Sequence, residues 1–529
     1  MSVHMFQKNI HKKNRNMRNF TFKGLFLTAV FTLLGCLSIQ AANDDLITKQ
    51  ITIKLDEAGT LPNKIGSSKM YKITNLKIVG EINGTDWSMI RDLAGTDYKG
   101  HSTEGNLSVL DLSEAKIVEG GDYYYYDGYN NYYTYNDEIG ECAFSGCSGL
   151  TSLTLPAGIT SIGVSAFSGC SGLTSLILPA GITSINNGTF SCCSGLTSLT
   201  LPAGITSIGI SAFAYCSGLT SLTLPASITS IGSRAFFGCS GLTSLTLPAG
   251  ITSIGDEAFS CCSGLTSLTL PAGITSIGVS AFFGCSGLTS LTLPVGITSI
   301  GGSAFFGCSG LTSLTLPAGI TSIGEWAFLG CSGLTSLTLP DGITSIGEYT
   351  FSGCSGLTSL TLPTGITSIG ERAFSGCSGL TSLTLPAGIT SINNGTFSGC
   401  SGLTSLTLPA GITSIGDEAF WDCSGLTSIY VYSEKVPKMG SDVFYGVDKK
   451  NCSLYVPQGT ETDYFLADVW GDFENIVEFD PTGIDKTTTS TDVEEVSRYS
   501  VNGQRLVGPA KGLNIVKYSD GTVKKIMVE

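Results

Sequence analysis

The sequence predicts a solenoid, in which one short segment repeats as coils that stack on each other. Three observations predict it. Between Cys147 and Asp422 the chain repeats one 23-residue phrase twelve times, C-S-G-L-T-S-L-T-L-P-A-G-I-T-S-I-G-x-x-A-F-x-G. Each copy carries apolar residues at strand spacing, and its cysteine recurs at one fixed position. A period of about 20 to 50 residues is typical of solenoids, because a single unit cannot bury its apolar face alone.

The first unit, residues 147–169, indicates how the phrase forms one coil. Leu153 and Leu155 alternate with hydroxyl residues, as in a short strand with one buried face. Pro156 ends that strand because it has no N–H to donate. The Ala-Gly pair then turns the chain, two isoleucines return to the core, and Ala-Phe closes the far side. Stacking such units is expected to bury continuous columns of Leu, Ile, Phe and Cys.

This phrase resembles the BspA-like (Treponema-type) leucine-rich repeats. It places Pro156 where many leucine-rich repeats have Asn, and A-F-x-x-C closes each unit. The resemblance covers all twelve units. It implies a leucine-rich-repeat solenoid that is mostly β, with an irregular or short helical convex side and capped ends. It also implies a surface protein of Bacteroidetes that binds host matrix proteins, host cells or other bacteria.

The flanks of the array, residues 147–422, extend the same rhythm. Residues 43–146 contain degenerate strand-like runs and a tyrosine-rich loop, and we expect them to form an N-terminal cap. Residues 423–480 hold a degenerate repeat and are expected to form a C-terminal cap. Caps are required because an open last coil would expose core side chains and unpaired strand edges.

Beyond the caps, residues 481–494 are rich in Thr and acidic residues, which is typical of a linker. Residues 495–529 hold three short strand-like runs. They resemble the C-terminal sorting module of Bacteroidetes exported proteins, with its N-G-x-x-[LV], K-G-[LI]-x-[IV] and closing K-x-[IV]-x-V pieces. The resemblance implies a small β module and delivery to the cell surface or the medium.

The N-terminal segment, residues 1–42, is typical of a secretory signal peptide. Six basic residues precede the apolar run Gly24–Ile39, and two alanines after it offer a cleavage site. A lipoprotein signal is the alternative, because Leu33-Leu34-Gly35-Cys36 resembles a lipobox whose Cys36 is acylated. No later segment has the ~18 to 20 apolar residues that a membrane span needs. We expect an extracellular or outer-surface protein without a membrane span.

Charge and histidine content argue against several classes of function. The formal net charge is −14, and the array has no Lys and two Arg against nine acidic residues, so a nucleic-acid partner is excluded. Only His101 follows the signal segment, and it has no obvious partner for acid/base chemistry. No phosphate-binding, zinc or nucleophile-elbow motif occurs. The sequence predicts no enzyme, no cofactor and no metal site.

Eighteen cysteines in an exported protein would normally suggest disulfides. Thirteen of them, from Cys147 to Cys423, recur every 23 residues. They should form one column at the strand spacing of about 4.8 Å, which is wider than the ~3.8 Å between Cβ atoms that a disulfide prefers. We expect buried free thiols that behave as small apolar residues.

The tyrosine-rich segment 123–135 is the first candidate for ligand contact. Its mixture of Tyr, Gly, Asn and Asp is typical of adaptable binding loops, and we expect a loop that protrudes between cap and array. A flexible polar insertion without function is the alternative interpretation. The candidate contact residues are Tyr123, Tyr124, Tyr125, Tyr126, Tyr129, Tyr132, Tyr133 and Tyr135.

Two other surfaces stay open as candidates. The outward strand positions form columns of Ser and Thr hydroxyls, which either suit a repetitive glycan or are ordinary solvent-side strand residues. On the opposite side, Glu325, Glu348 and Glu371 share a column, as do Phe283 and Phe306. The glutamates lack the ordered oxygens of a calcium site, and the aromatic residues form either an anchor patch or extra packing.

The sequence therefore predicts an exported adhesin or protein-interaction scaffold. A glycan-binding or structural surface-coat protein is the alternative. Ice binding is a third hypothesis, because regular Thr columns also suit an ice lattice.

Overall fold

The computed structural model describes residues 45–480, 495–500, 505–518 and 523–528. The chain divides into two compact units. The first runs to Asp137 and includes Gly146–Ala157, and the second comprises Glu138–Ser145 and the chain from Gly158 onwards. The predicted signal segment with Cys36 and the predicted linker 481–494 lie outside the described residues.

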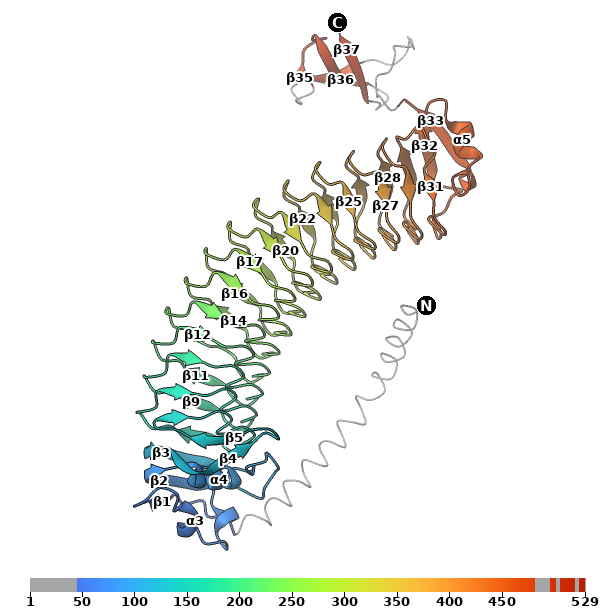
Figure 1. Ribbon diagram of the computed structural model, residues 1–529. Coiled ribbons are helices and arrows are strands. Elements are labelled where there is room, and N and C mark those ends of the chain that lie inside the picture. The colour runs from blue at the N-terminus through green and yellow to red at the C-terminus, as the bar shows by residue number, and fades with distance from the viewer. Residues whose placement is uncertain (1–44, 481–494, 501–504, 519–522, 529) are drawn as a thin grey trace. The chain divides into compact units, whose positions relative to one another are not determined.

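The first unit is built on a parallel sheet with the strand order β1-β2-β3-β7. Helices and a hairpin accompany this sheet (Figure 1). Its elements are β1 (Ile51–Lys54), α3 (Leu61–Lys64), η1 (Met70–Lys72), β2 (Asn75–Ile82), α4 (Gly84–Leu93), β3 (Val109–Ile117), β4 (Gly120–Tyr126), β5 (Asn131–Thr134) and β7 (Ser152–Thr154).

Helix α4 is an element that the strand rhythm of the cap does not predict. Asn83 is its N-cap, and Asp86 completes a capping box, so two backbone N–H groups of the first turn are satisfied. The Asp86 carboxylate also accepts bonds from the N–H groups of Gly59, at 2.6 Å, and Leu61, at 2.8 Å. This buried carboxylate ties the start of α4 to the segment before α3.

The second unit is the stack of coils that the period predicts. Most coils have a strand on one side whose middle leucine is buried between an exposed Ser and Thr, and pairing partners lie 23 residues apart, as Leu245 and Leu268 do (Figure 1). The strands are β9 (Ser175–Ile177), β11 (Ser198–Thr200), β14 (Ser244–Thr246), β16 (Ser267–Thr269), β18 (Ser290–Thr292), β20 (Ser313–Thr315), β22 (Ser336–Thr338), β24 (Ser359–Thr361), β26 (Ser382–Thr384) and β28 (Ser405–Leu408).

A second set of two-residue strands lies on another side of the coils, and each of them points one isoleucine toward the core. They pair in parallel with the same spacing, beginning with β6 (Glu138–Ile139). The others are β8 (Ser161–Ile162), β10 (Ser184–Ile185), β12 (Ser207–Ile208), β13 (Ser230–Ile231), β15 (Ser253–Ile254), β17 (Ser276–Ile277), β19 (Ser299–Ile300), β21 (Ser322–Ile323), β23 (Ser345–Ile346), β25 (Ser368–Ile369), β27 (Ser391–Ile392) and β29 (Ser414–Ile415).

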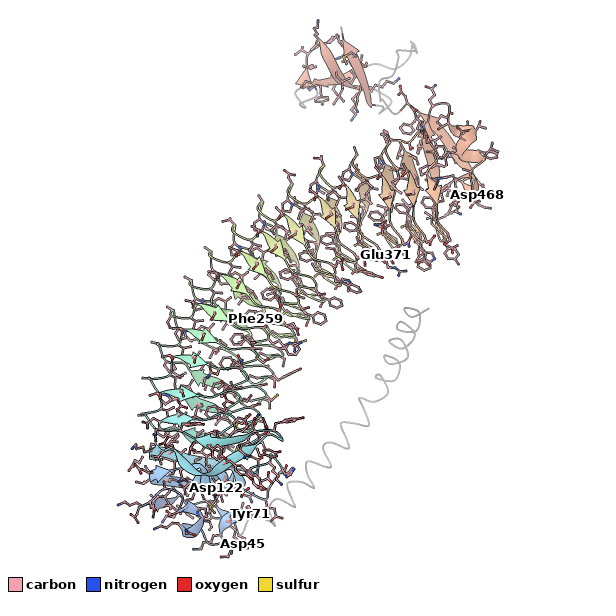
Figure 2. All side chains as sticks on the ribbon, in the orientation of Figure 1. Asp45, Tyr71, Asp122, Phe259, Glu371 and Asp468 are labelled. Atoms are coloured by element: carbon pink, nitrogen blue, oxygen red, sulfur yellow. The ribbon has the colours of Figure 1, made fainter. Side chains whose placement is uncertain are left out.

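The core of the second unit consists of residue columns that run from coil to coil. Leucine, isoleucine, phenylalanine and cysteine of nearly every unit are buried, as the phrase predicts, and Ile323, Leu360 and Leu362 are half-buried. The phenylalanine rings stack in parallel: Phe259 lies 5.4 Å from Phe236 and 5.6 Å from Phe282 between ring centroids (Figure 2). Such ladders make every coil depend on both neighbours for the burial of its ring.

Each coil also contains a left-handed residue two positions before the phenylalanine. Ser280 has φ of 52°, Trp326 of 64° and Tyr349 of 52° at this position. Glycine takes the same place in two coils, at Gly188 and Gly395. Because a left-handed conformation is costly for a residue with a Cβ atom, the turn stores strain in most coils.

The stack ends in a cap formed by β30 (Ser428–Val431), β31 (Lys438–Met439), β32 (Ser453–Pro457), α5 (Glu461–Phe465), η2 (Trp470–Asp472) and β33 (Asn475–Phe479). Trp470 is fully buried and contacts Phe444, the last ring of the phenylalanine ladder, at 5.5 Å between centroids. Tyr464 is buried beside it. These large side chains cover the last coil.

The C-terminal residues form a separate antiparallel sheet with the order β35-β34-β36-β37. Its strands are β34 (Glu495–Ser500), β35 (Arg505–Leu506), β36 (Gly512–Tyr518) and β37 (Val523–Val528). Arg498 is buried there and bonds to Glu495 and Asn514.

Candidate binding surfaces

The tyrosine-rich segment forms an ordered β-hairpin, β4 and β5, instead of an irregular loop. Asp127 organises its turn. The Asp127 carboxylate accepts hydrogen bonds from the N–H groups of Asn130, at 2.7 Å, and Tyr129, at 2.8 Å, and from the hydroxyl of Tyr132, at 2.8 Å. The bonds from Asn130, Tyr129 and Tyr132 hold the pKa of Asp127 down at about 2. The sequence signal for this turn is the Asp-Gly pair between tyrosine runs.

The hairpin tyrosines differ sharply in exposure. Tyr129, at the tip, is 92% exposed, and Tyr133 and Tyr135 are also exposed. Tyr123, Tyr125, Tyr126 and Tyr132 are half-buried.

The prediction that Tyr124 contacts a ligand is wrong. Its side chain is 1% exposed and packs against Trp87 of α4, with ring centroids 6.3 Å apart. It is a core residue of the first unit, because alternate residues of a strand point to opposite faces and β4 turns this one inward.

Close packing against α4 makes the hairpin a rigid part of the first unit. The Arg91 guanidinium lies 4.6 Å from the ring centroid of Tyr125. The Thr85 hydroxyl and the Asp122 carboxylate are hydrogen-bonded at 3.2 Å. A side chain at Gly84 would collide with the carbonyl oxygen of Asp122, so only glycine permits this approach.

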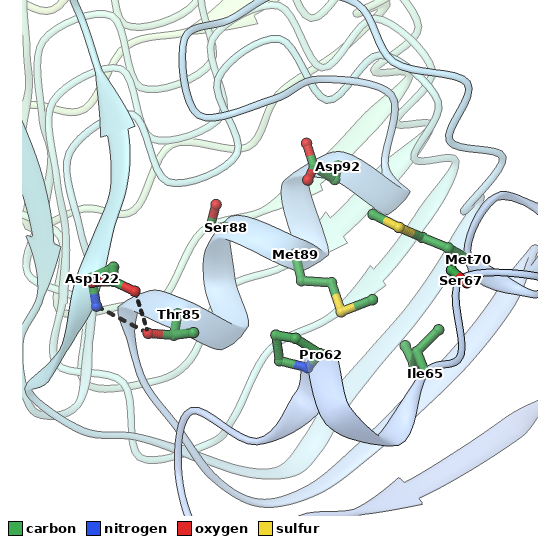
Figure 3. A pocket seen from close by; sticks show the side chains of 9 residues that line it. All are labelled: Pro62, Ile65, Ser67, Met70, Thr85, Ser88, Met89, Asp92 and Asp122. Atoms are coloured by element: carbon green, nitrogen blue, oxygen red, sulfur yellow. Dashed lines mark hydrogen bonds between the residues drawn. The ribbon is translucent and has the colours of Figure 1, made fainter.

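A pocket of about 400 Å³ lies beside this contact in the first unit (Figure 3). Pro62, Ile65, Met70 and Met89 give it apolar walls. Asp92 lies at its rim, and burial, with the nearby charge of Asp97, raises the pKa of its carboxyl. Its lining thus combines apolar walls with two acidic residues, Asp92 and Asp122, and three hydroxyl residues, Ser67, Thr85 and Ser88.

The strand face of the second unit carries two kinds of hydroxyl. Thr243 donates to the backbone oxygen of Thr220 in the previous coil at 3.3 Å, and the same bond recurs in neighbouring units. Ser244 and Thr246 are exposed, and within the described residues their hydroxyls have no partner in the chain. The two strand columns therefore offer free hydroxyls to a ligand.

The opposite face carries the variable residues. Phe283 stacks on Phe306 at 4.6 Å and Trp326 on Tyr349 at 4.4 Å. Trp326 is 38% exposed, so the Trp326–Tyr349 pair is neither buried in the core nor fully exposed to solvent. Arg372 binds Glu371 at 3.6 Å and also Glu418, so part of the acidic column is neutralised (Figure 2).

The cysteine column is buried and reduced, with no disulfide among the described residues. From Cys170 onwards, each thiol of the column donates to the backbone oxygen of a phenylalanine 26 residues earlier, such as Cys285 to Phe259 at 3.0 Å. Burial raises the pKa of the Cys239 and Cys308 thiols to about 12, so both stay protonated at neutral pH. Outside the column, Cys192 is exposed, and Cys142 and Cys261 are half-buried.

The structure gives His101 a partner that the sequence does not indicate. Its Nδ1 lies 3.2 Å from an Asp97 carboxylate oxygen, on an exposed loop. Among the described residues, no group of three or more His, Cys, Asp or Glu side chains is placed to hold a metal ion. The same part of the chain has no helix that combines the length and the apolar character needed to cross a membrane.

A known family model matches a large part of the chain. The model described as "BspA type Leucine rich repeat region (6 copies)" matches residues 129–224, 206–335 and 327–451, more than half of the chain. No curated protein matches the chain.

Several solved structures are similar. A leucine-rich repeat protein from Bacteroides ovatus is 30% identical, with a TM-score of 0.50, over 59% of this chain and 88% of that one. A leucine rich cell surface protein from Faecalibacterium prausnitzii is 27% identical, with a TM-score of 0.39, over 65% of this chain and 87% of that one. The leucine rich repeat protein of T. pallidum is 30% identical, with a TM-score of 0.27, over 35% of this chain and 74% of that one.

Proposed function

Because this chain belongs to the BspA type leucine rich repeat family, we propose that it is an exported cell-surface scaffold that adheres to protein partners. Leucine-rich-repeat solenoids typically bind proteins and typically lack enzymatic activity. The partners we propose are host matrix proteins, host cell surfaces or the surfaces of other bacteria. The anionic, lysine-free array supports a protein partner over a nucleic acid.

The tyrosine hairpin is the observation that carries this proposal. Tyr129 is 92% exposed at its tip, and the bonds to Asp127 hold that tip in one conformation. A rigid, exposed aromatic ring binds a partner with little loss of conformational entropy. Tyr133 and Tyr135 extend the same exposed surface.

The test replaces Tyr129, Tyr133 and Tyr135 by serine and measures adherence to immobilised matrix proteins and to cells. Adherence should fall at least about tenfold, as expected when interface anchors are truncated. Tyr445→Ser is the matched control, because Tyr445 is an exposed tyrosine of the second unit and its loss should leave adherence unchanged. Equal adherence of the triple variant and the unaltered protein would remove the hairpin from the proposal.

A glycan-binding or surface-coat role is the alternative, and the free strand hydroxyls support it. Columns such as Ser244 with Ser267 repeat at strand spacing and could align with a repeating sugar chain. A glycan array separates the two functions. A protein adhesin gives no polysaccharide signal, whereas the alternative requires a signal that weakens when Thr246 and Thr269 are replaced by valine.

Export is part of the proposal and is supported by the sequence of both ends. Residues 1–42 are typical of a signal peptide, with lipid attachment at Cys36 as the alternative. Residues 495–529, whose described part is an antiparallel sheet, resemble a sorting module. Removal of residues 495–529 should retain the protein inside the cell envelope, which fractionation and immunoblotting would measure. Unchanged surface delivery would contradict this role.

A further inference from the structure

A second pocket lies at the C-terminal end of the stack of coils. Its volume is about 500 Å³, which is in the range of small-ligand pockets. One wall is the turn Ala410–Thr413 of the last regular repeat, and the other is the segment Tyr432–Lys438 of the degenerate repeat that follows.

A one-residue insertion creates this pocket. Strands β28 and β30 pair with a spacing of 23 residues, Ser405 with Ser428. On the other side of the turn, β29 and β31 pair with a spacing of 24, Ser414 with Lys438. The extra residue therefore lies in the turn, where Tyr432 also stands in place of the repeat's proline. The turns of these two coils consequently differ in path, and a pocket lies between them.

The inserted segment is held firmly from behind. The buried Tyr464 hydroxyl donates to the Ser433 carbonyl oxygen at 2.7 Å, and the buried Trp470 indole N–H donates to the Pro437 carbonyl oxygen at 3.4 Å. The Ser433 hydroxyl donates to the Lys435 carbonyl oxygen at 2.7 Å. A segment fixed by buried side chains presents its outward groups in a preorganised arrangement.

The charges of this pocket are unusual for the chain. Lys435 and Lys438 are exposed and line it, and within the described residues neither makes an ion pair. The two other lysines of the cap are paired: Lys449 with Asp472 at 2.7 Å and Lys450 with Glu474 at 3.7 Å. The pocket therefore presents two lysines without an ion pair, beside the single carboxylate of Glu434, at the end of an array without a lysine.

The remaining lining groups suit a sugar better than a simple anion. Tyr432 offers an aromatic ring, which Phe479 supports edge-on at 5.1 Å between centroids. Glu434 also lines the pocket. A carboxylate there repels a bare anion, whereas it accepts hydrogen bonds from hydroxyl groups. Lysines can pair with the charge of the ligand, and the ring can pack on its C–H face.

We propose that the pocket between Ala410–Thr413 and Tyr432–Lys438 binds an anionic sugar residue, whose charge is a carboxylate or a sulfate. Lys435 and Lys438 bind the charged group. Glu434 accepts hydrogen bonds from the hydroxyl groups of the sugar, and Tyr432 packs on the sugar ring. This site uses no residue of the tyrosine hairpin, so it stands apart from protein adhesion.

Isothermal titration calorimetry on the full chain tests the proposal with three oligosaccharides: an oligogalacturonate, a sulfated galactose oligomer and a neutral galactose oligomer. We expect one acidic oligomer to bind and the neutral one not to bind. The oligomer that binds identifies the charged group. Failure of both acidic oligomers, or equal binding of the neutral one, would overturn the proposal.

The double variant Lys435→Gln/Lys438→Gln should weaken acidic-sugar binding at least about tenfold, because charge-assisted hydrogen bonds are lost. The matched control is Lys449→Gln/Lys450→Gln, which removes the same charge from the same cap and should bind normally. Equal losses in both double variants would contradict a defined site. Sugar binding that persists in the hairpin triple variant separates this site from the proposed adhesin function.

Discussion

The thiol of Cys308 donates a hydrogen bond to the backbone oxygen of Phe282, 3.1 Å away and 26 residues earlier in the chain. The same oxygen accepts the N–H of Cys285 within its own turn. One carbonyl group thus closes its own coil and binds the next, while both side chains stay in the apolar core. The cysteine column therefore links the coils without covalent bonds.

Thiol reactivity should divide the cysteines into two groups. Burial raises the pKa of thiols such as Cys308 to about 12, so the reactive thiolate is scarce at pH 8. Maleimide labelling of the folded protein, read by mass spectrometry, should modify Cys192 first and leave the buried column unmodified until denaturant is added. Rapid labelling of Cys308 under native conditions would contradict the buried column.

Loss of one ring from the phenylalanine ladder should destabilise the array strongly. Phe305 is fully buried between Phe282 and Phe328, at 5.4 and 5.3 Å. Phe305→Ala should lower the free energy of unfolding by about 3–5 kcal/mol, measured by denaturant titration. The adjacent Phe306→Ser is the control, because serine is the usual residue at this half-buried position, and its cost should stay below about 1.5 kcal/mol. Similar costs for both would show that the ladder is not the main core contact.

Glycine at a strained turn position should stabilise the protein. Ser280 has φ of 52°, and Gly188 and Gly395 show that glycine is accepted at this position. Ser280→Gly should raise the free energy of unfolding by up to about 1 kcal/mol, because relief of the left-handed strain exceeds the added chain entropy.

The reverse change provides the control for Ser280→Gly. Gly284 has φ of 68°, and a Cβ atom there would meet no atom closer than 3.8 Å. Gly284→Ala should therefore cost about 1 kcal/mol through backbone strain alone. Thermal melts of both variants would measure the effect, and destabilisation by Ser280→Gly would refute the strain argument.

The hairpin turn should loosen in acid. The folded-state pKa of Asp127 is about 2, below the ordinary 3.8, because its carboxylate accepts bonds from Asn130, Tyr129 and Tyr132. The stability that the ionised Asp127 carboxylate gives to the folded turn is complete above the ordinary pKa and is lost as the pH falls through about 2. The protection factors of the Asn130 and Tyr129 amides against hydrogen exchange, measured by NMR, should fall over this range. Asp127→Asn should abolish the pH dependence, whereas an unchanged profile would show that the carboxylate does not hold the turn.

The repeated phrase was sufficient to predict the array. The alternation of Leu153 with Ser152 and Thr154, the inward isoleucines and the buried cysteine column are confirmed. A fixed period makes such predictions reliable, because each inward position must meet its own copy in the next coil. The same argument predicts no property of segments that do not repeat.

The caps were predicted less completely for that reason. The capping box of Asn83 and Asp86 marks the start of α4 in the sequence, yet strand-like neighbours obscure it. The inward orientation of Tyr124 depends on the pairing of β4 with β5 and on Trp87 of α4. The pocket at Lys435 depends on a one-residue insertion whose path is fixed by distant Tyr464 and Trp470. Each feature rests on tertiary contacts that a local pattern does not contain.

The uniform spacing between coils affects how the number of repeats can change during evolution. Most coils present the same bonding groups upward and downward, since Leu245 meets Leu268 as Leu291 meets Leu314. Excision of one whole unit would bring together surfaces that already fit. Recombination between the near-identical segments of the gene can therefore lengthen or shorten the molecule in steps of one coil, and natural variants should differ in reach while keeping both caps.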